Sequence, residues 1–178
     1  VVACTRVLAP TLMGRGTRLH QMAVDWLRDT YRRTRPRGTG RRIYISRQNA
    51  PRRRLLNEAE LARHLTARGF ETQAPDTLSF AQQLDAVAGA TMIVGPHGAG
   101  LSNMIFAPDG VRVVEIANEH AIFGYTKALA ESFGARLTTV VGTVAPGSTA
   151  SGQAADFTID MAATLATIDA AIAELRTV

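Results

Sequence analysis

Short runs of apolar residues alternate along this chain with longer segments in which apolar residues recur at every third or fourth position. The short runs predict strands over residues 41–46, 91–95, 111–116 and 136–141, and alternation of apolar and polar residues predicts a fifth strand over residues 70–74. The longer segments predict amphipathic helices before, between and after these strands. This alternation indicates an α/β fold, in which a Rossmann-like, doubly wound parallel sheet carries helices on both faces.

The helix predictions rest on the apolar stripe of each segment and on signals at its ends. Asn57 with Glu60 three residues later resembles a capping box, and Ser79 with Gln82 gives the same signal. Asp160 is the expected cap of the last helix. For the first helix we expect a buried face of Leu19, Ala23, Trp26, Leu27 and Thr30 and a solvent face of Arg28, Asp29, Arg32 and Arg33.

The composition is typical of one soluble globular domain, which we expect to span residues 1–178. Apolar residues make up 46% of the chain and charged residues 20%. No run of about 18 apolar residues marks a transmembrane helix. Cys4 is the only cysteine, so no internal disulfide or cysteine-based zinc site can form. We expect a cytoplasmic protein, which could also lie at a membrane surface, and a piece of a longer one, since no initiator Met begins the chain.

Basic charge is concentrated in one region of the chain. The formal net charge is +5, and eleven arginines fall between Arg28 and Arg54, where Asp29 is the only acid. Such a region suits phosphate groups or an acidic surface. Nucleic-acid binding is a further alternative, which the low aromatic content of 6% and the lack of a recognisable nucleic-acid motif disfavour.

Polar and glycine-rich residues follow the predicted strands at their carboxyl ends. They are residues 46–47, 52–58 and 96–103, together with Glu115. Because parallel strands end at the same edge of a sheet, these pieces are expected to lie on one rim, where doubly wound sheets bind their ligands.

The segment P-H-G-A-G-L after the third predicted strand is the candidate anion site. Gly98 and Gly100 let the backbone approach a ligand, and the start of the following short helix favours an anion. His97 could donate a charge-assisted hydrogen bond to a phosphate. The alternative is a purely structural turn in which His97 bonds only to backbone.

Glu115 and the arginines after the first strand complete the candidate site. An acid at a strand end can bind ribose hydroxyls, so Glu115 is the expected ribose ligand, with an ordinary exposed carboxylate as the alternative. Arg47 and the arginines of residues 51–58 suit phosphate oxygens, because a guanidinium forms a planar fork of donors. Most arginines from Arg28 to Arg42 are better explained as a solvated helix face. No D-x-D pair occurs in the chain, so we expect no metal at the site.

Six motifs in order resemble the glycosyltransferase 61 family, also described as capsular polysaccharide biosynthesis-like proteins. The motifs lie between Tyr44 and Ile116 and read Y-I-S-R, R-R-L-L-N-E-A-E-L, G-F, L-S-F-x-x-Q, G-P-H-G-A-G-L-S-N-M-I-F-A-P and V-V-E-I. The resemblance implies the donor-binding, C-terminal half of a GT-B enzyme. Such an enzyme transfers a sugar from a nucleotide-diphosphate sugar to a glycan acceptor, with inversion and without a metal or other cofactor.

The resemblance also assigns roles to residues. Arg47 and Arg53 would bind phosphates, and Glu115 would hold the ribose. His97, Gly98, Ala99, Gly100 and Leu101 would cradle the diphosphate, with His97 stabilising the leaving group, and Ser46 and Asn57 are expected at the same donor site. The acceptor-binding half and the catalytic base would lie outside this chain, and we expect a bacterial protein. A non-catalytic nucleotide-binding module is the main alternative.

Overall fold

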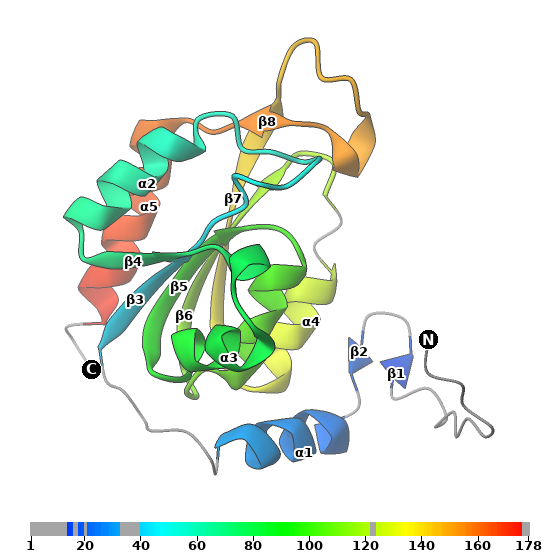
Figure 1. Cartoon of the computed structure of the whole chain (residues 1–178), viewed down its shortest axis with the longest axis vertical. Helices are drawn as coiled ribbons and strands as arrows, with labels where there is room; N and C mark the ends of the chain where they lie inside the picture. The colour runs from blue at the N-terminus through cyan, green and yellow to red at the C-terminus, as the bar shows by residue number, and fades with distance from the viewer. Residues whose placement is uncertain (1–13, 16–17, 20, 33–39, 122–123, 176–178) are drawn as a thin grey trace.

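The computed structural model describes residues 14–15, 18–19, 21–32, 40–121 and 124–175 (Figure 1). The strands are β1 (Gly14–Arg15), β2 (Arg18–Leu19), β3 (Arg41–Ile45), β4 (Phe70–Gln73), β5 (Ala90–Pro96), β6 (Arg112–Asn118), β7 (Arg136–Val144) and β8 (Phe157–Thr158). The α-helices are α1 (Gln21–Arg32), α2 (Glu58–Ala67), α3 (Phe80–Ala88), α4 (Gly124–Ser132) and α5 (Met161–Glu174). Three 3₁₀ helices complete the set, η1 (Pro75–Thr77), η2 (Ala99–Phe106) and η3 (Gly152–Ala154).

The main sheet has the strand order β4-β3-β5-β6-β7-β8. Its first five strands are parallel, which confirms the α/β class and all five predicted strands. The prediction of a wholly parallel sheet is wrong at one edge, because β8 pairs with β7 in the antiparallel sense. The connection from β7 to β8 holds only the short η3, and a return without a crossover helix leaves the next strand antiparallel.

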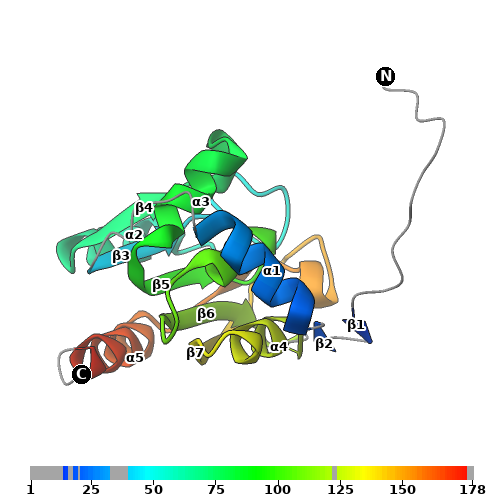
Figure 2. The same cartoon turned by 90° about the horizontal axis from the view of Figure 1, so that it is seen from below.

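Helices cover both faces of the sheet. The helices α2 and α5 pack on one face, while α1, α3 and α4 pack on the other, as Figures 1 and 2 show. Alternate residues of β3 enter the two cores, with Ile43 and Ile45 facing α3 and Tyr44 facing α2. The chain turns from one direction of winding to the other between β3 and β5, so the topological switch point lies between their carboxyl ends.

The predicted faces of α1 are wrong in part, although Leu27 packs against the core and Asp29 is exposed as expected. Trp26, expected in the core, is 64% exposed, whereas Arg28, expected in solvent, is 4% exposed. The Arg28 guanidinium donates to the backbone oxygens of Ile105 and Ala107 and pairs with Asp109. A buried arginine is tolerated here because its donors have carbonyl and carboxylate acceptors.

Two of the three predicted helix caps are confirmed, and the third is wrong. Ser79 and Gln82 form a full capping box, and Asp160 accepts from the backbone N–H of Ala163. Asn57 precedes α2 but makes no side-chain cap. Its amide instead binds both backbone groups of Ile159, donating to the oxygen at 2.9 Å and accepting from N–H at 3.3 Å.

Some sequence predictions fall on residues that the structure does not describe. These are Arg33, Arg35 and Arg37 of the basic region and the start of the fourth predicted helix at Ile122. Within the described ranges, every helix is too short or too polar to cross a membrane.

Candidate anion-binding site

The candidate site lies at the carboxyl ends of β3 and β5, beside the switch point. Residues 46–57 leave β3 and run along this rim, and residues 96–101 leave β5 next to them. In Figure 1 the loop after β3, drawn in cyan, and the segment that leads to β8, drawn in orange, also meet at this end of the sheet. The prediction that residues 46–47, 52–58 and 96–103 share one rim is therefore confirmed, whereas the side chain of Glu115 is buried.

Arg47 lies directly against the glycine loop. A Cβ atom on Gly98 would fall 3.0 Å from Cζ of Arg47, and closer still to Nη1. Burial lowers the pKa of Arg47, and the neighbouring charge of Arg53 lowers it further. Nε of Arg47 is buried and has no hydrogen-bond partner among the described residues. This guanidinium is thus partly dehydrated and incompletely satisfied at the point where a ligand would bind.

Arg53 is held in a left-handed conformation with φ of 54°. Its backbone N–H donates to the oxygen of Ala154 at 3.0 Å, and its Nη1 donates to the oxygen of His97 at 3.4 Å. Burial lowers the pKa of Arg53, and the charge of Arg52 lowers it further. A non-glycine residue in this region costs about 1–2 kcal/mol, so the surrounding bonds must hold it in place.

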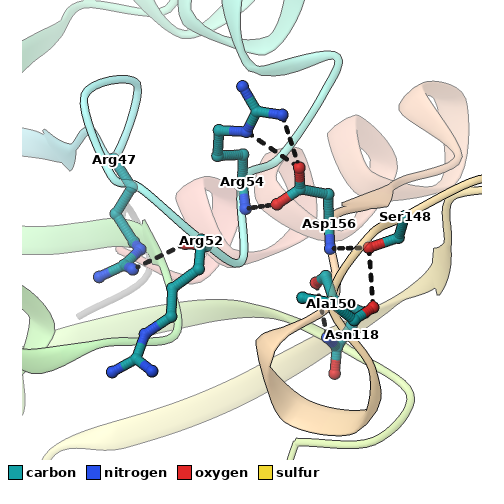
Figure 3. Close-up of polar contacts among 8 residues, drawn as sticks. Arg47, Arg52, Arg54, Asn118, Ser148, Ala150 and Asp156 are labelled. Atoms are coloured by element: carbon teal, nitrogen blue, oxygen red, sulfur yellow. Dashed lines mark hydrogen bonds and ion pairs between the residues drawn. The ribbon is translucent and has the colours of Figure 1, made fainter.

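The C-terminal part of the chain holds the arginine loop. The N–H of Leu56 donates to the oxygen of Phe157, whose own N–H donates to the oxygen of Arg54. Figure 3 shows the Arg54 guanidinium on Asp156, with the side chains of Arg47 and Arg52 extending away from that pair. Arg54 therefore secures the loop, while Arg47 and Arg53 lie next to the glycine loop.

His97 is bonded at both its backbone and its ring. Its N–H donates to the oxygen of Ile116 at 2.7 Å, which continues the pairing of β5 with β6. Its ring Nδ1 lies 2.6 Å from Oε1 of Glu115, and the side chain is 15% exposed. The His97 ring thus lies between the buried carboxylate of Glu115 and the pocket at the rim of the sheet.

Glu115 does not lie where a ribose ligand must lie. Its side chain is 0% exposed, and its carboxylate accepts from the hydroxyls of Thr126 at 2.7 Å and Thr139 at 3.4 Å, beside the ring of His97. The structure contradicts both the ribose role and the exposed alternative, because the carboxylate contacts no solvent. It is an internal partner of His97.

Glu58 is a site residue that sequence reasoning missed. Its Oε1 accepts from the hydroxyls of Tyr44 at 3.0 Å and Ser46 at 2.7 Å and from the N–H of Arg47 at 2.8 Å. Burial raises the pKa of Tyr44, and the charge of Glu58 adds to this effect. A signal was present, because Tyr44 and Ser46 share the inward face of a buried strand and two buried hydroxyls require a partner.

Two pockets open on either side of Arg47 and Gly98. The first, at the switch point, has a volume of about 250 Å³ and is lined by Ile45, Ser46, Arg47, Asn49, Ala50, Pro51, Pro75, Asp76, Pro96, Gly100 and Leu101. The second has a volume of about 340 Å³ and is lined by Arg53, His97, Gly98, Ala99, Leu101, Ser102, Met104, Tyr125, Thr126 and Leu129. Of the ten predicted site residues, eight line one of these pockets; Asn57 and Glu115 line neither, being bonded to Ile159 and His97 respectively.

The described part of the chain contains no group of three or more His, Cys, Asp or Glu side chains placed to hold a metal ion. Metal independence nevertheless stays a prediction, since a ligand can itself supply metal-binding oxygens.

Comparison with known proteins places this site in context. A family model described as Glycosyltransferase 61 matches residues 2–114, which include Arg47, Arg53 and the glycine loop. The EGF domain-specific O-linked N-acetylglucosamine transferase of Bos taurus is 35% identical over 88 residues, 47% of this chain and 17% of the relative. The proteins of the same name from Pan troglodytes and Gallus gallus are 35% and 33% identical over 82 residues, 43% of this chain. The matched part spans about a sixth of the length of these relatives. They are animal proteins, so they give no support to the expected bacterial source or capsular role.

Proposed function

The chain belongs to the glycosyltransferase 61 family, as its motifs indicated, and from this premise we propose that it binds the diphosphate of a nucleotide-sugar donor. The protein would transfer the sugar of that donor to a glycan or protein acceptor. The relatives are named for transfer of N-acetylglucosamine, which makes a donor carrying that sugar the first to test.

One observation carries the proposal: Arg47, Arg53 and His97 converge on a glycine loop at the switch point. Burial lowers the pKa of both arginines, and so does repulsion, by Arg53 on Arg47 and by Arg52 on Arg53, so this arrangement is unfavourable without an anion. A diphosphate would remove the repulsion and supply acceptors to guanidinium groups that are only partly satisfied. Gly98 has no Cβ, which lets the Arg47 guanidinium lie directly on the loop where the phosphate oxygens would bind.

The two pockets suggest how the donor lies. The switch-point pocket has apolar walls that include Ile45, Pro51 and Pro75 and one polar edge, where Asn49 donates to Asp76 at 2.9 Å. A nucleobase has apolar faces and a polar edge, so we assign the base to this pocket. The diphosphate then lies over Gly98, and the sugar reaches the pocket that His97 and Tyr125 line.

The chemistry of such a site is electrostatic. As the glycosidic bond breaks, negative charge grows on the departing diphosphate, and preorganised cationic donors stabilise that charge. Arg47, Arg53 and His97 would fill this role without a metal ion, and the reaction would invert the anomeric carbon. We propose that the acceptor and the base that activates it belong to a second half of a GT-B enzyme.

A thermal-shift panel of nucleoside diphosphates, their sugars and the bare nucleosides tests the proposal. A ligand at 100 times its Kd stabilises a protein by about 2.7 kcal/mol, which raises the Tm of a chain of this size by roughly 5–10 °C. Diphosphates should give this shift and nucleosides a small one. Equal shifts for both, or none, would reject the donor site.

A non-catalytic nucleotide-binding module is the second candidate. It would bind the same ligands but would neither hydrolyse nor transfer the sugar in the full-length protein. Nucleic-acid binding is disfavoured by the structure, because several arginines of the basic region are already used. Arg28 is buried, Arg41 pairs with Glu71 and Arg54 pairs with Asp156.

A further inference from the structure

We propose that Glu115 is a positioning residue that fixes the ring of His97 with a proton on Nδ1 and directs its other nitrogen toward the ligand. The inference deepens the proposed function and rests on it for the nature of the ligand. The Glu115 carboxylate is 0% exposed and lies 2.6 Å from Nδ1, whereas the His97 side chain is 15% exposed and lines the pocket of Tyr125 and Ser102. Glu115 therefore reaches a ligand only through His97.

The hydrogen-bond inventory assigns the proton. An ionised carboxylate only accepts, so its contact with Nδ1 requires the proton on that nitrogen. The Thr126 hydroxyl has a single proton, which it donates to Oε1 of Glu115 at 2.7 Å, so it cannot also donate to Nδ1 at 3.4 Å. With Nδ1–H bonded inward, Nε2 is left to face the ligand: it accepts from a sugar hydroxyl when the ring is neutral and donates to a phosphate oxygen when the ring is an imidazolium.

The charges around His97 explain why a buried carboxylate is needed to hold its ring. Arg53 approaches His97 from the loop after β3, and Arg47 lies against Gly98 beside it. Positive charge therefore lies on the rim side of the His97 segment. Glu115 from β6, supported by Thr126 from α4, supplies the opposite charge on the buried side. A carboxylate–histidine pair of this kind fixes tautomer and orientation in other sites as well.

Nitrogen-15 NMR of the His97 ring tests the assignment in the unmodified chain. The signal is identified among the four histidines by its loss in His97→Gln. We expect the shift of a protonated Nδ1 in the absence of ligand. A ring protonated mainly on Nε2, the form that an unconstrained neutral imidazole prefers in water, would overturn the inference. This measurement on the unmodified chain does not depend on whether a Glu115 variant folds.

Pyrophosphate and UDP binding tests the function of the pair. Glu115→Gln should weaken the binding of both ligands by about tenfold, since a buried charge no longer orients the ring. Thr126→Val should move the nitrogen-15 shifts of the His97 ring in the same direction as Glu115→Gln does. Thr164→Val removes another buried threonine hydroxyl, on α5, and serves as the matched control that changes neither. In a His97→Ala background, Glu115→Gln should have no further effect on affinity, because it acts through the ring.

The outcomes separate the inference from the proposed function. Equal losses from Glu115→Gln with and without His97 would show that Glu115 acts independently, and the inference would fail while the donor site stands. If the unmodified chain binds neither pyrophosphate nor UDP, the proposed function fails, and the ring shifts still decide whether Glu115 fixes the tautomer.

Discussion

Substitution of Gly98 by alanine should separate ligand binding from folding. Gly98 has φ of 164° and ψ of 175°, an extended conformation that alanine also adopts. The new Cβ would fall 3.0 Å from Cζ of Arg47 and nearer to Nη1. The obstacle is the end of a flexible side chain, so we expect the Arg47 guanidinium to move and the backbone to stay.

The expected magnitudes follow from that geometry. Displacing the Arg47 guanidinium removes one charge-assisted contact to the diphosphate, worth about 1.5–3 kcal/mol, or roughly 10- to 100-fold in Kd. Stability should change by less than about 1 kcal/mol, because alanine loses less backbone entropy than glycine on folding and offsets the local shift. Calorimetric titration with UDP measures the first effect and thermal unfolding the second.

Gly95→Ala is the matched control for this prediction. A Cβ there would lie 3.1 Å from Cβ of Ile45 and 3.2 Å from its backbone oxygen, so β3 and β5 themselves would have to move apart. This variant should lose stability, whereas Gly98→Ala should lose affinity. If Gly98→Ala binds UDP as tightly as the parent chain, Arg47 does not contact the diphosphate and the argument is refuted.

Variants at three further positions test the other parts of this region separately. Arg53→Ala and Arg53→Gly should both weaken UDP, while the glycine variant should be the more stable by up to about 1 kcal/mol, since glycine accepts a positive φ freely; equal unfolding temperatures would exclude strain at this position. Asn57→Ala should cost about 1–2 kcal/mol in denaturant unfolding, because both backbone groups of Ile159 lose their partner, yet leave UDP affinity unchanged; a selective loss of affinity would restore Asn57 as a donor ligand. The bond to Arg54 lowers the pKa of Asp156, so their pairing stabilises the fold above the ordinary carboxyl pKa and is lost as the pH falls below about 4; the Tm of Asp156→Asn should therefore fall less between pH 6 and pH 3 than that of the parent chain, and parallel curves would count against the pairing.

The sequence predicted the strands well because a parallel sheet is built from local signals. The strands are marked by short apolar runs or, at residues 70–74, by alternation of apolar and polar residues, and the glycine loop follows β5 as expected. The strand β8 was missed because its two residues, Phe157 and Thr158, carry no pattern of their own. Its pairing depends on β7 and on the loop of Arg54, which lies about a hundred residues earlier in the chain.

The wrong predictions for single residues arise where the surroundings of a side chain depend on contacts that a local pattern does not record. A strand buried on both faces shows no alternation of polar and apolar residues, so V-V-E-I cannot tell whether Glu115 points to the rim or into the core. The role of Asn57 likewise depends on Ile159, a partner 102 residues away. Arg28 looked like a surface residue because its acceptors are backbone oxygens of η2 and the residue after it, which a side-chain pattern does not record.

The central claim is that this rim binds a diphosphate through its own cationic groups. Calorimetric titration of the unmodified chain with UDP and with uridine, in buffer that contains EDTA, tests that claim most directly. The account predicts that UDP binds at least about 100-fold more tightly than uridine, since two or more charge-assisted contacts of about 1.5–3 kcal/mol each distinguish the ligands. Equal affinities for the two ligands, or UDP binding that appears only when Mn²⁺ is added, would contradict it.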